Sequence, residues 1–368
     1  MIRLTFVGDI ACDRPLLKAA RKWGKYDFSR VFQTSGDFEN SDLVIGNLET
    51  CFGGGHYGTK AYHYSSPDSF CDAIRDAGFD IVSTANNHCL DEGVDGLIRT
   101  LGILDKNGIA HTGTFSGEEQ EKRYLIKEIN SIRIAFYSLT YDVNTTIESS
   151  ACDDVSKYVN ALNFRKKTYS GNPIKRCWQV RVRPALKKVY RIARYGTIIH
   201  QQTDTLTQNS INQEWLARID AQIMKAREEA DILVVLLHIG GQFNPEPGTF
   251  SEYMVKHLSE LGVDVIAGHH PHTVQRIGQL GETHVAYSLG GYCLSPSASY
   301  LVRESLPEYS VAWHVDIDEN KRIAATSAQI LQCVEDAGRY VHVVEAEGSS
   351  ADLDAIRERL GLTPKSTI

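Results

Sequence analysis

Val263-Asp-Val-Ile-Ala-Gly-His-His-Pro-His272 joins a short apolar run to a cluster of three histidines. A run of this length that is rich in Val and Ile predicts a buried strand, so the histidines stand at its carboxyl end. The same order occurs upstream, where His238 closes the run Ile232-Leu-Val-Val-Leu-Leu237. In open α/β sheets, ligands bind outside the carboxyl ends of the strands. These stretches therefore predict an α/β fold with a site built from strand ends.

Polar residues occupy equivalent positions in the N-terminal part of the chain. Asp9 follows Leu4-Thr-Phe-Val-Gly8, Glu49 follows Leu43-Val-Ile-Gly-Asn-Leu48, and the motif Asn86-Asn-His88 follows a third strand pattern. Imidazole, carboxylate and amide oxygen form a ligand set that suits Mn, Fe or Zn. We therefore expect a site for one or two divalent metal ions, and its candidate ligands are Asp9, Glu49, Asn87, His238, His270 and His272.

A simpler interpretation exists for each of these residues alone. A single histidine after a strand is more often a structural or surface residue than a metal ligand. The pair His270 and His272 is more specific, because two imidazoles two residues apart on one loop can converge on one ion. Since all the motifs occur in one chain, we favour the metal site. Mn is the ion that we expect, with Fe and Zn as the alternatives.

The composition is typical of a soluble globular protein, because 42% of the 368 residues are hydrophobic and 23% are charged. The longest apolar runs reach about eight residues, far short of the ~20 of a membrane-spanning helix. Met1 leads directly into a predicted strand, without the basic and long apolar regions of a secretory signal. The eight cysteines form no C-x-x-C pair, which is typical of reduced thiols. We therefore expect a cytoplasmic location.

Strand and helix patterns alternate over most of the chain and predict a parallel or mixed sheet flanked by helices. We expect one domain over residues 1–330 and a C-terminal strand-helix extension over residues 331–368. Residues 141–212 break the alternation and are interpreted as a basic insertion or lid. Residues 155–203 contain twelve Lys or Arg and no Asp or Glu. Such a patch attracts anions, and a solvated basic face is an equally weighted alternative.

Four residues are candidates for contact with an anionic substrate: Arg14, His269, Lys188 and Arg191. Arg14 begins a predicted helix over Arg14–Lys25, and the two residues of the insertion lie on the charged face of a predicted amphipathic helix over Pro184–Gly196. This helix also suits peripheral contact with a membrane surface, although a packed surface helix is the commoner outcome of such a pattern. A nucleic-acid partner is not expected, because no binding motif accompanies the basic residues.

Six motifs together resemble the capsule-synthesis family of the calcineurin-like metallophosphoesterases, which is associated with poly-γ-glutamate capsules. They are Gly8-Asp9, Gly46-Asn-Leu-Glu-Thr50, Ala85-Asn-Asn-His-Cys-Leu-Asp91, His238-Ile-Gly240, Gly268-His-His-Pro-His272 and Tyr287-Ser-Leu-Gly290. The resemblance covers about residues 5–295, with the basic segment as an unmatched insertion. It implies a four-layer α/β/β/α sandwich with metal ions at the strand ends.

The resemblance also implies a role for each site residue. Asp9 and His272 would hold a first metal ion, Glu49 would bridge two ions, and the second ion would be held by Asn87, His238 and His270. His88 would protonate the leaving oxygen of the substrate, and Asp91 would orient His88.

Ala11 marks a departure from the wider superfamily, which has a histidine ligand two residues after the first Asp. Ile239 and Gln242 also stand where the capsule family usually has Trp and Glu, and Gly291 replaces a frequent Asn.

The expected function is a metal-dependent hydrolase that acts on a phosphoester, or on an amide of an anionic, capsule-related polymer. The missing ligand keeps a second function open, that of a non-hydrolytic accessory protein of capsule or exopolysaccharide biosynthesis that binds an anionic polymer of the poly-γ-glutamate type.

Overall fold

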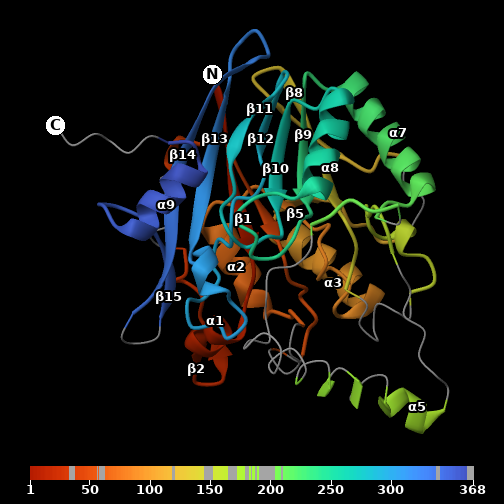
Figure 1. The fold of residues 1–368 in the computed structure, drawn as a ribbon, viewed down its shortest axis with the longest axis vertical. Helices are drawn as coiled ribbons and strands as arrows, with labels where there is room; N and C mark the ends of the chain where they lie inside the picture. The colour runs from red at the N-terminus through yellow and green to blue at the C-terminus, as the bar shows by residue number, and fades with distance from the viewer. Residues whose placement is uncertain are drawn as a thin grey trace.

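The computed structural model describes the chain apart from residues 33–37, 56, 58–62, 118–120, 145–151, 165–171, 179–181, 184, 187, 188, 190–203, 209, 337–339 and 363–368. Its centre consists of two mixed β-sheets (Figure 1). The seven-stranded sheet has the order β15 (Val341–Glu345), β14 (Ile323–Glu335), β13 (Tyr309–Ile317), β1 (Ile2–Ile10), β4 (Leu43–Leu48), β5 (Ile81–Ser83) and β6 (Ala110–Thr112). The six-stranded sheet has the order β11 (Ile277–Leu280), β12 (Thr283–Ala286), β10 (Val265–His269), β9 (Ile232–His238), β8 (Ile132–Thr140) and β7 (Leu125–Ile129). The predicted mixed α/β fold is therefore confirmed.

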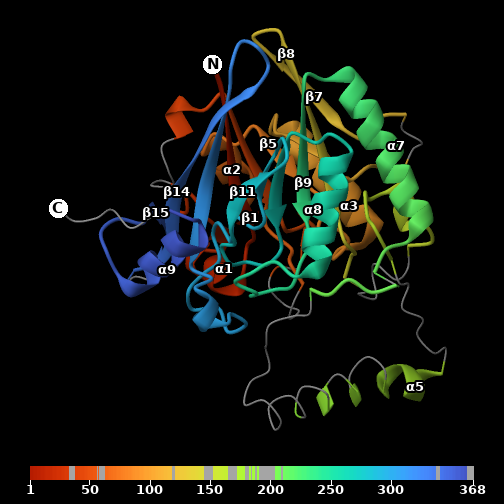
Figure 2. The same cartoon turned by 45° about the horizontal axis from the view of Figure 1, so that its top comes forward.

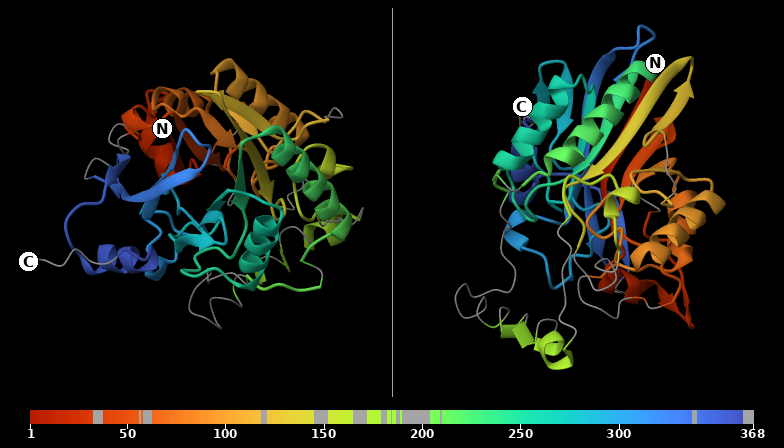
Figure 3. Two further views of the ribbon diagram at one scale, coloured as in Figure 1. Left: turned by 90° about the horizontal axis from the view of Figure 1, so that it is seen from above. Right: turned by 90° about the vertical axis from the view of Figure 1, so that its right-hand side faces the viewer.

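The two sheets share one apolar core. Phe6 and Trp313 from the seven-stranded sheet belong to the same buried cluster as Val234 and Val265 from the six-stranded sheet. Because side chains alternate along a strand, the opposite face of each sheet also carries apolar residues and must be covered. Helices do this on both sides, as Figures 2 and 3 show.

Helices α1 (Arg14–Ala20), α2 (Asp68–Asp76) and α3 (Gly93–Lys106) lie on the seven-stranded sheet, and α7 (Gln213–Glu229) and α8 (Thr249–Glu260) lie on the six-stranded sheet. Each buries one apolar stripe. In α2, Phe70 and Ile74 are four residues apart and fully buried, so they share one face of the helix. Further helical segments are α5 (Pro173–Cys177), α9 (Ala351–Arg359) and the 3₁₀ turns η1 (Phe38–Asn40), η2 (Val155–Lys157) and η4 (Arg303–Ser305).

The carboxyl ends of the central strands meet where the two sheets touch. Strand β1 runs parallel to β4, and β9 runs parallel to β10. The segment after β12 crosses from one sheet to the other, because Leu289 N–H donates to the Gly268 carbonyl at 3.1 Å and Asp9 N–H donates to the Gly290 carbonyl at 3.0 Å. A Cβ atom at Gly8 would lie 2.0 Å from the Gly290 carbonyl oxygen, so only glycine allows this approach.

The predicted helix over Arg14–Lys25 is too long. Helix α1 ends at Ala20, and a small hairpin follows, formed by β2 (Arg21–Lys22) and β3 (Lys25–Tyr26). Trp23 and Gly24 form its turn with φ of 49° and 78°. Positive φ at both central residues is the geometry of a tight hairpin turn, and Gly24 supplies it without strain. The turn at Trp23 and Gly24 therefore ends the helical pattern earlier than the sequence analysis predicted.

The C-terminal residues join the same architecture. Strand β14 spans the predicted boundary at residue 330, β15 pairs with it as the edge strand, and Leu353 and Ile356 of α9 enter the core shared by the two sheets. In the basic segment, α5 stands away from the sheets (Figure 2), while Lys188, Arg191 and most of the predicted helix around them lie outside the described residues. Over the part of the chain that the structure describes, no helix has the length and apolar character needed to cross a membrane.

Candidate metal centre

The strand ends of both sheets bring five of the predicted ligands into two overlapping groups. In each group, one ligand atom per residue lies within 4.8 Å of the others, and the groups are Asp9, Glu49 and His272, and Glu49, His238 and His270. Asp9 is the penultimate residue of β1, Glu49 follows β4, and His238 ends β9. Glu49 belongs to both groups, which is the position that a bridging carboxylate requires.

The second group, of Glu49, His238 and His270, is compact and gains Asn87. His238 Nε2 lies 2.8 Å from Asn87 Oδ1, 3.1 Å from His270 Nδ1 and 3.7 Å from Glu49 Oε1. Two donor atoms that each lie about 2.1 Å from one ion are about 3.0 to 3.5 Å apart in tetrahedral or octahedral geometry. One of the three separations lies in this range and the other two lie within a few tenths of an ångström on either side of it, so small shifts of the side chains would place two imidazoles, one carboxylate and one amide oxygen around a single divalent ion.

The first group, of Asp9, Glu49 and His272, has fewer donors. His272 Nδ1 lies 3.0 Å from Asp9 Oδ2, and His272 Nε2 lies 3.6 Å from Glu49 Oε2. Ala11, two residues after Asp9, is fully buried and has no donor atom. An ion in this group would rely on water or substrate for the rest of its coordination.

The surroundings of the Glu49 carboxylate indicate whether a cation fits between the two groups. The carboxylate is 0% exposed, and neither of its oxygens has a hydrogen-bond partner among the described residues. Burial, followed by the charges of Asp9 and Asp91, raises the pKa of Glu49 well above its ordinary value. A buried carboxylate without a partner is costly, and a divalent cation between its oxygens and the histidines would compensate for the cost. The donor set thus fits a metal ion.

The pKa shifts of Asp9, His238 and His270 favour the protonation states that metal binding needs. Burial raises the pKa of Asp9, but the hydrogen bond with His272 and the charges of His272 and His238 hold it below its ordinary value overall. Burial and the neighbouring His270 lower the pKa of His238, and burial and His272 lower the pKa of His270 to about 3. Neutral imidazoles and an ionised carboxylate are the forms that coordinate metals.

The loop after β10 is held in a strained conformation. His270 and His272 have φ of 94° and 53°, which residues other than glycine adopt rarely and at a cost of about 1 to 3 kcal/mol each. His270 N–H donates to Asp9 Oδ2 at 3.1 Å, and Phe243 N–H donates to the Pro271 carbonyl at 2.7 Å. These bonds fix the loop so that both imidazoles face the carboxylates.

His88 and Asp91 form a buried pair beside Glu49. His88 Nδ1 lies 2.6 Å from Asp91 Oδ2, and His88 Nε2 lies 3.9 Å from Glu49 Oε1. Tyr64 supports both residues, because its N–H donates to Asp91 Oδ2 at 2.8 Å and its ring centre lies 4.3 Å from that of His88. Asp91 therefore fixes the imidazole ring with Nε2 directed toward the two groups.

Three asparagines of the site were not predicted as site residues. Asn47 Nδ2 donates to Asp9 Oδ1 at 2.7 Å and lies 3.1 Å from His238 Nδ1. Asn86 accepts from His88 N–H at 3.1 Å, and Asn144 Nδ2 lies 3.3 Å from His88 Nδ1. Asn47 could have been found, because residues two apart on a strand share a face and Glu49 is two residues on. Asn144 lies in the segment that was interpreted as an insertion, where no pattern singled it out.

Of the four residues that were predicted to contact substrate, the structure describes two, and these differ in their exposure to solvent. His269 is 1% exposed, and its Nε2 lies 3.1 Å from the Val7 carbonyl, so this side chain joins β10 to β1 and has no access to solvent. Arg14 is exposed as the first residue of α1 and follows the helix cap Asp13. Lys188 and Arg191 are outside the described residues.

Comparison with known proteins gives a family match. The family described as "Bacterial capsule synthesis protein PGA_cap" matches residues 3–294. An uncharacterized protein, y4sH, of Sinorhizobium fredii is 27% identical over 308 residues, which are 78% of this chain and 64% of the relative. The PGA biosynthesis protein CapA of Bacillus subtilis is 26% identical over 297 residues, which are 79% of this chain and 63% of the relative. The chain thus spans less than two thirds of the length of these relatives.

A solved structure with some likeness is a 5'-nucleotidase precursor from Thermus thermophilus. It has a TM-score of 0.40 and 12% identity, and the match covers 96% of this chain and 56% of the other.

Proposed function

The chain belongs to the bacterial capsule synthesis protein family PGA_cap, and from this membership and the geometry of the site we propose that it is a metal-dependent hydrolase. The substrate class is an anionic phosphoester, or an amide of an anionic, capsule-related polymer. The observation that carries the proposal is the position of Glu49, whose two unpartnered oxygens face two groups of donors. One or two divalent ions, with Mn expected, would polarise the scissile group and lower the pKa of a bound water. The proposal includes the four-layer order of the metallophosphoesterases, which the core shared by the sheets and the helices outside them support.

His88 is the candidate general acid. Its Nδ1 is engaged with Asp91, so a proton on Nε2 is directed toward the space beside Glu49. A leaving oxygen at that position would accept this proton, and the Asp91 carboxylate would stabilise the imidazolium form before transfer. Asn144 would also restrain the imidazole ring, because its Nδ2 lies 3.3 Å from His88 Nδ1.

The test is hydrolysis of a chromogenic phosphodiester and a phosphomonoester by Mn-loaded protein. His88→Ala should lower turnover by ~10²–10⁴ while the bound Mn measured by mass spectrometry is unchanged. His111→Ala is the matched control, because His111 also pairs with an aspartate, Asp105, but lies on the edge strand β6. Equal turnover of His88→Ala and the control would remove His88 from the mechanism. Absence of turnover in Mn-loaded protein on both esters would refute phosphoester hydrolysis.

A second candidate function is supported by Ala11. Because this buried position offers no ligand, the first group has fewer donors than the second, and a site that binds an anionic polymer without cleaving it is the alternative. Titration with poly-γ-glutamate and with a phosphopolymer, at low and high salt, tests this role. Tight, salt-sensitive binding without cleavage would support it. A lack of binding to either polymer would exclude it.

A further inference from the structure

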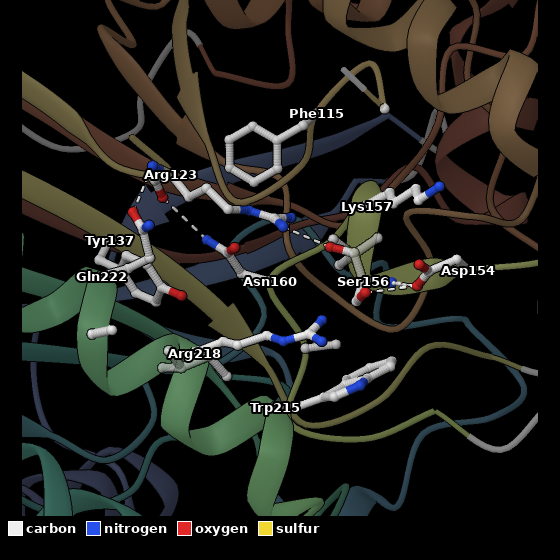
Figure 4. A pocket seen from close by; sticks show the side chains of 15 residues that line it. Phe115, Arg123, Tyr137, Asp154, Ser156, Lys157, Asn160, Trp215, Arg218 and Gln222 are labelled. Carbon is white, nitrogen blue, oxygen red and sulfur yellow. Dashed lines mark hydrogen bonds between the residues drawn. The ribbon is translucent and has the colours of Figure 1, made fainter. Parts of the chain in front are cut away.

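A cavity lies apart from the candidate metal centre, against the outer face of the six-stranded sheet. Its volume is about 680 Å³, within the range of ~300–1,000 Å³ that is common for small-molecule sites. Helix α7, strand β8 and the segment around η2 form its walls (Figure 4). None of its lining residues belongs to either metal group.

Positive charge exceeds negative charge around this cavity. Arg123, Arg218 and Lys157 line it, while Asp154 is the one carboxylate among the lining residues. Asp154 is already occupied, because its Oδ1 accepts from Ser156 N–H at 3.1 Å and from Ser156 Oγ at 2.6 Å. Within the described structure, Arg218 pairs with one carboxylate at the surface, Glu214, four residues away on the same helix, and a pair of this kind is weak. The cavity therefore suits an anion.

The guanidinium of Arg123 is the most unusual group here. Its Nη1 donates to the Ser156 carbonyl at 2.6 Å, but its Nε and Nη2 are buried and have no hydrogen-bond partner in the described structure. Burial, and next the nearby Arg218, lower the pKa of Arg123. Buried N–H donors without acceptors are destabilising, so an acceptor supplied by a ligand would remove this cost.

Aromatic rings accompany these charges. Arg123 lies over the ring of Phe115, with 4.3 Å from its guanidinium carbon to the ring centre. Trp215 is half-buried on α7, one turn before Arg218, and Figure 4 shows both side chains on the wall opposite Arg123. The indole is available to pack against a planar group, because aromatic stacking on Trp combines apolar contact with a defined geometry.

The frame of the cavity is formed by internal hydrogen bonds. Gln222 Oε1 accepts from Arg123 N–H at 2.9 Å, which ties α7 to the start of β7. Asn160 Nδ2 donates to the Arg123 carbonyl at 3.2 Å and to the Ser138 carbonyl at 3.0 Å. A site whose walls are already fixed loses less conformational freedom when a ligand binds.

We propose that this cavity binds a small molecule in which an anionic group is joined to a planar ring, such as a nucleoside monophosphate. The anionic group lies between Arg123 and Arg218, and the ring packs on Trp215. This site is separate from the metal centre and does not depend on the proposed hydrolase function.

Calorimetric titration of the full chain with AMP, benzoate, inorganic phosphate and adenosine tests the proposal. At least one of the two ring anions should bind more tightly than both phosphate and adenosine, and the preferred one identifies the anionic group as phosphate or carboxylate. Arg218→Ala should weaken its binding about tenfold or more, since a charge-assisted hydrogen bond is lost. Trp215→Ala should weaken binding of the ring anion and leave the weaker binding of phosphate unchanged.

Two controls separate this cavity from other anion sites. Lys256→Ala removes an exposed cation that pairs with Glu260 on α8, and it should leave affinity unchanged. Asp9→Asn disturbs the metal centre and should also leave it unchanged. The proposal is overturned if neither ring anion binds below about 10 mM, a very weak affinity. It is also overturned if Arg218→Ala binds as tightly as the parent protein, or if Asp9→Asn abolishes binding.

Discussion

Glu49→Gln should stabilise the metal-free protein, and this advantage over the parent protein should disappear when metal is added. Glu49 is fully buried, has no hydrogen-bond partner among the described residues and lies close to the carboxylates of Asp9 and Asp91. A neutral amide of the same shape removes the charge repulsion and most of the desolvation cost. We expect the metal-free variant to gain about 2 kcal/mol in free energy of unfolding.

The corresponding shift in Tm follows from the size of the chain. With about 2.1 cal/mol/K of unfolding entropy per residue, 2 kcal/mol raises Tm by about 2 to 3 °C. Mn at about 100 times its Kd should stabilise the parent protein by about 2.7 kcal/mol, which raises Tm by about 3 to 4 °C. In the variant, loss of the shared carboxylate should lower affinity by about 100-fold or more, so the same Mn concentration should shift Tm by less than about 1 °C.

Differential scanning calorimetry of both proteins, after chelation and after addition of Mn, measures all four values. Glu260→Gln is the control, because Glu260 is exposed on α8 and its replacement should change stability by less than about 0.5 kcal/mol. A full Mn-dependent shift in the variant would show that Glu49 is not a metal ligand shared by two groups. A lower Tm for metal-free Glu49→Gln would refute the reasoning that the buried carboxylate is costly without a cation.

Three further predictions concern the surroundings of the site and the sheet that carries it. Asn47→Ala should weaken Mn binding by about 10- to 100-fold in calorimetry, because the variant lacks the amide that positions Asp9 and His238. An unchanged affinity for Mn would show that Asn47 does not position these ligands. Gly8→Ala should destabilise the protein by about 3 kcal/mol in urea unfolding. Gly102→Ala, where a Cβ meets no atom within 4 Å, should instead stabilise α3 by up to about 1 kcal/mol. Similar effects of the two changes on the free energy of unfolding would contradict this prediction. Arg3→Met should lower the free energy of unfolding by about 0.5 to 1 kcal/mol at pH 7, because the Arg3 guanidinium lowers the pKa of Asp316. This stabilisation exists above the ordinary pKa of the carboxyl and is lost as the pH falls below it, so the two proteins should be equally stable near pH 2. A difference in stability that stays constant with pH would refute the prediction.

The clustering of the candidate metal ligands was predictable from the sequence because strand ends are local features. Each ligand follows a short apolar run, and parallel strands place their carboxyl ends at one edge of a sheet, so Asp9 and Glu49 could be expected side by side. The hairpin formed by β7 and β8 is a second feature with a local origin. Its signal is local too, since two strands are separated by Asn130 and Ser131, both with positive φ.

Other features depend on contacts between distant residues and carried no local signal. Strand β14 is the longest strand of the sheet, but the first half of Ile323–Glu335 is mostly exposed and lacks apolar alternation. The cavity beside α7 combines Arg123 with Arg218, which read as ordinary surface charges in a sequence. Only the fold shows that they line one cavity and that one guanidinium has two buried N–H groups without a hydrogen-bond partner among the described residues.

The two halves of the metal centre come from distant parts of the chain. His238 and Asn47 are 191 residues apart, and His270 and Asp9 are 261 residues apart. At a synthesis rate of about 5 to 20 residues per second, the carboxylates leave the ribosome roughly 10 to 40 seconds before the first of these histidines. During this interval the N-terminal strands have no imidazole partners, and the carboxylates of Asp9 and Glu49 remain hydrated. Assembly of the candidate metal centre is therefore a late event in folding, and a bound metal ion would report that both halves of the chain have assembled.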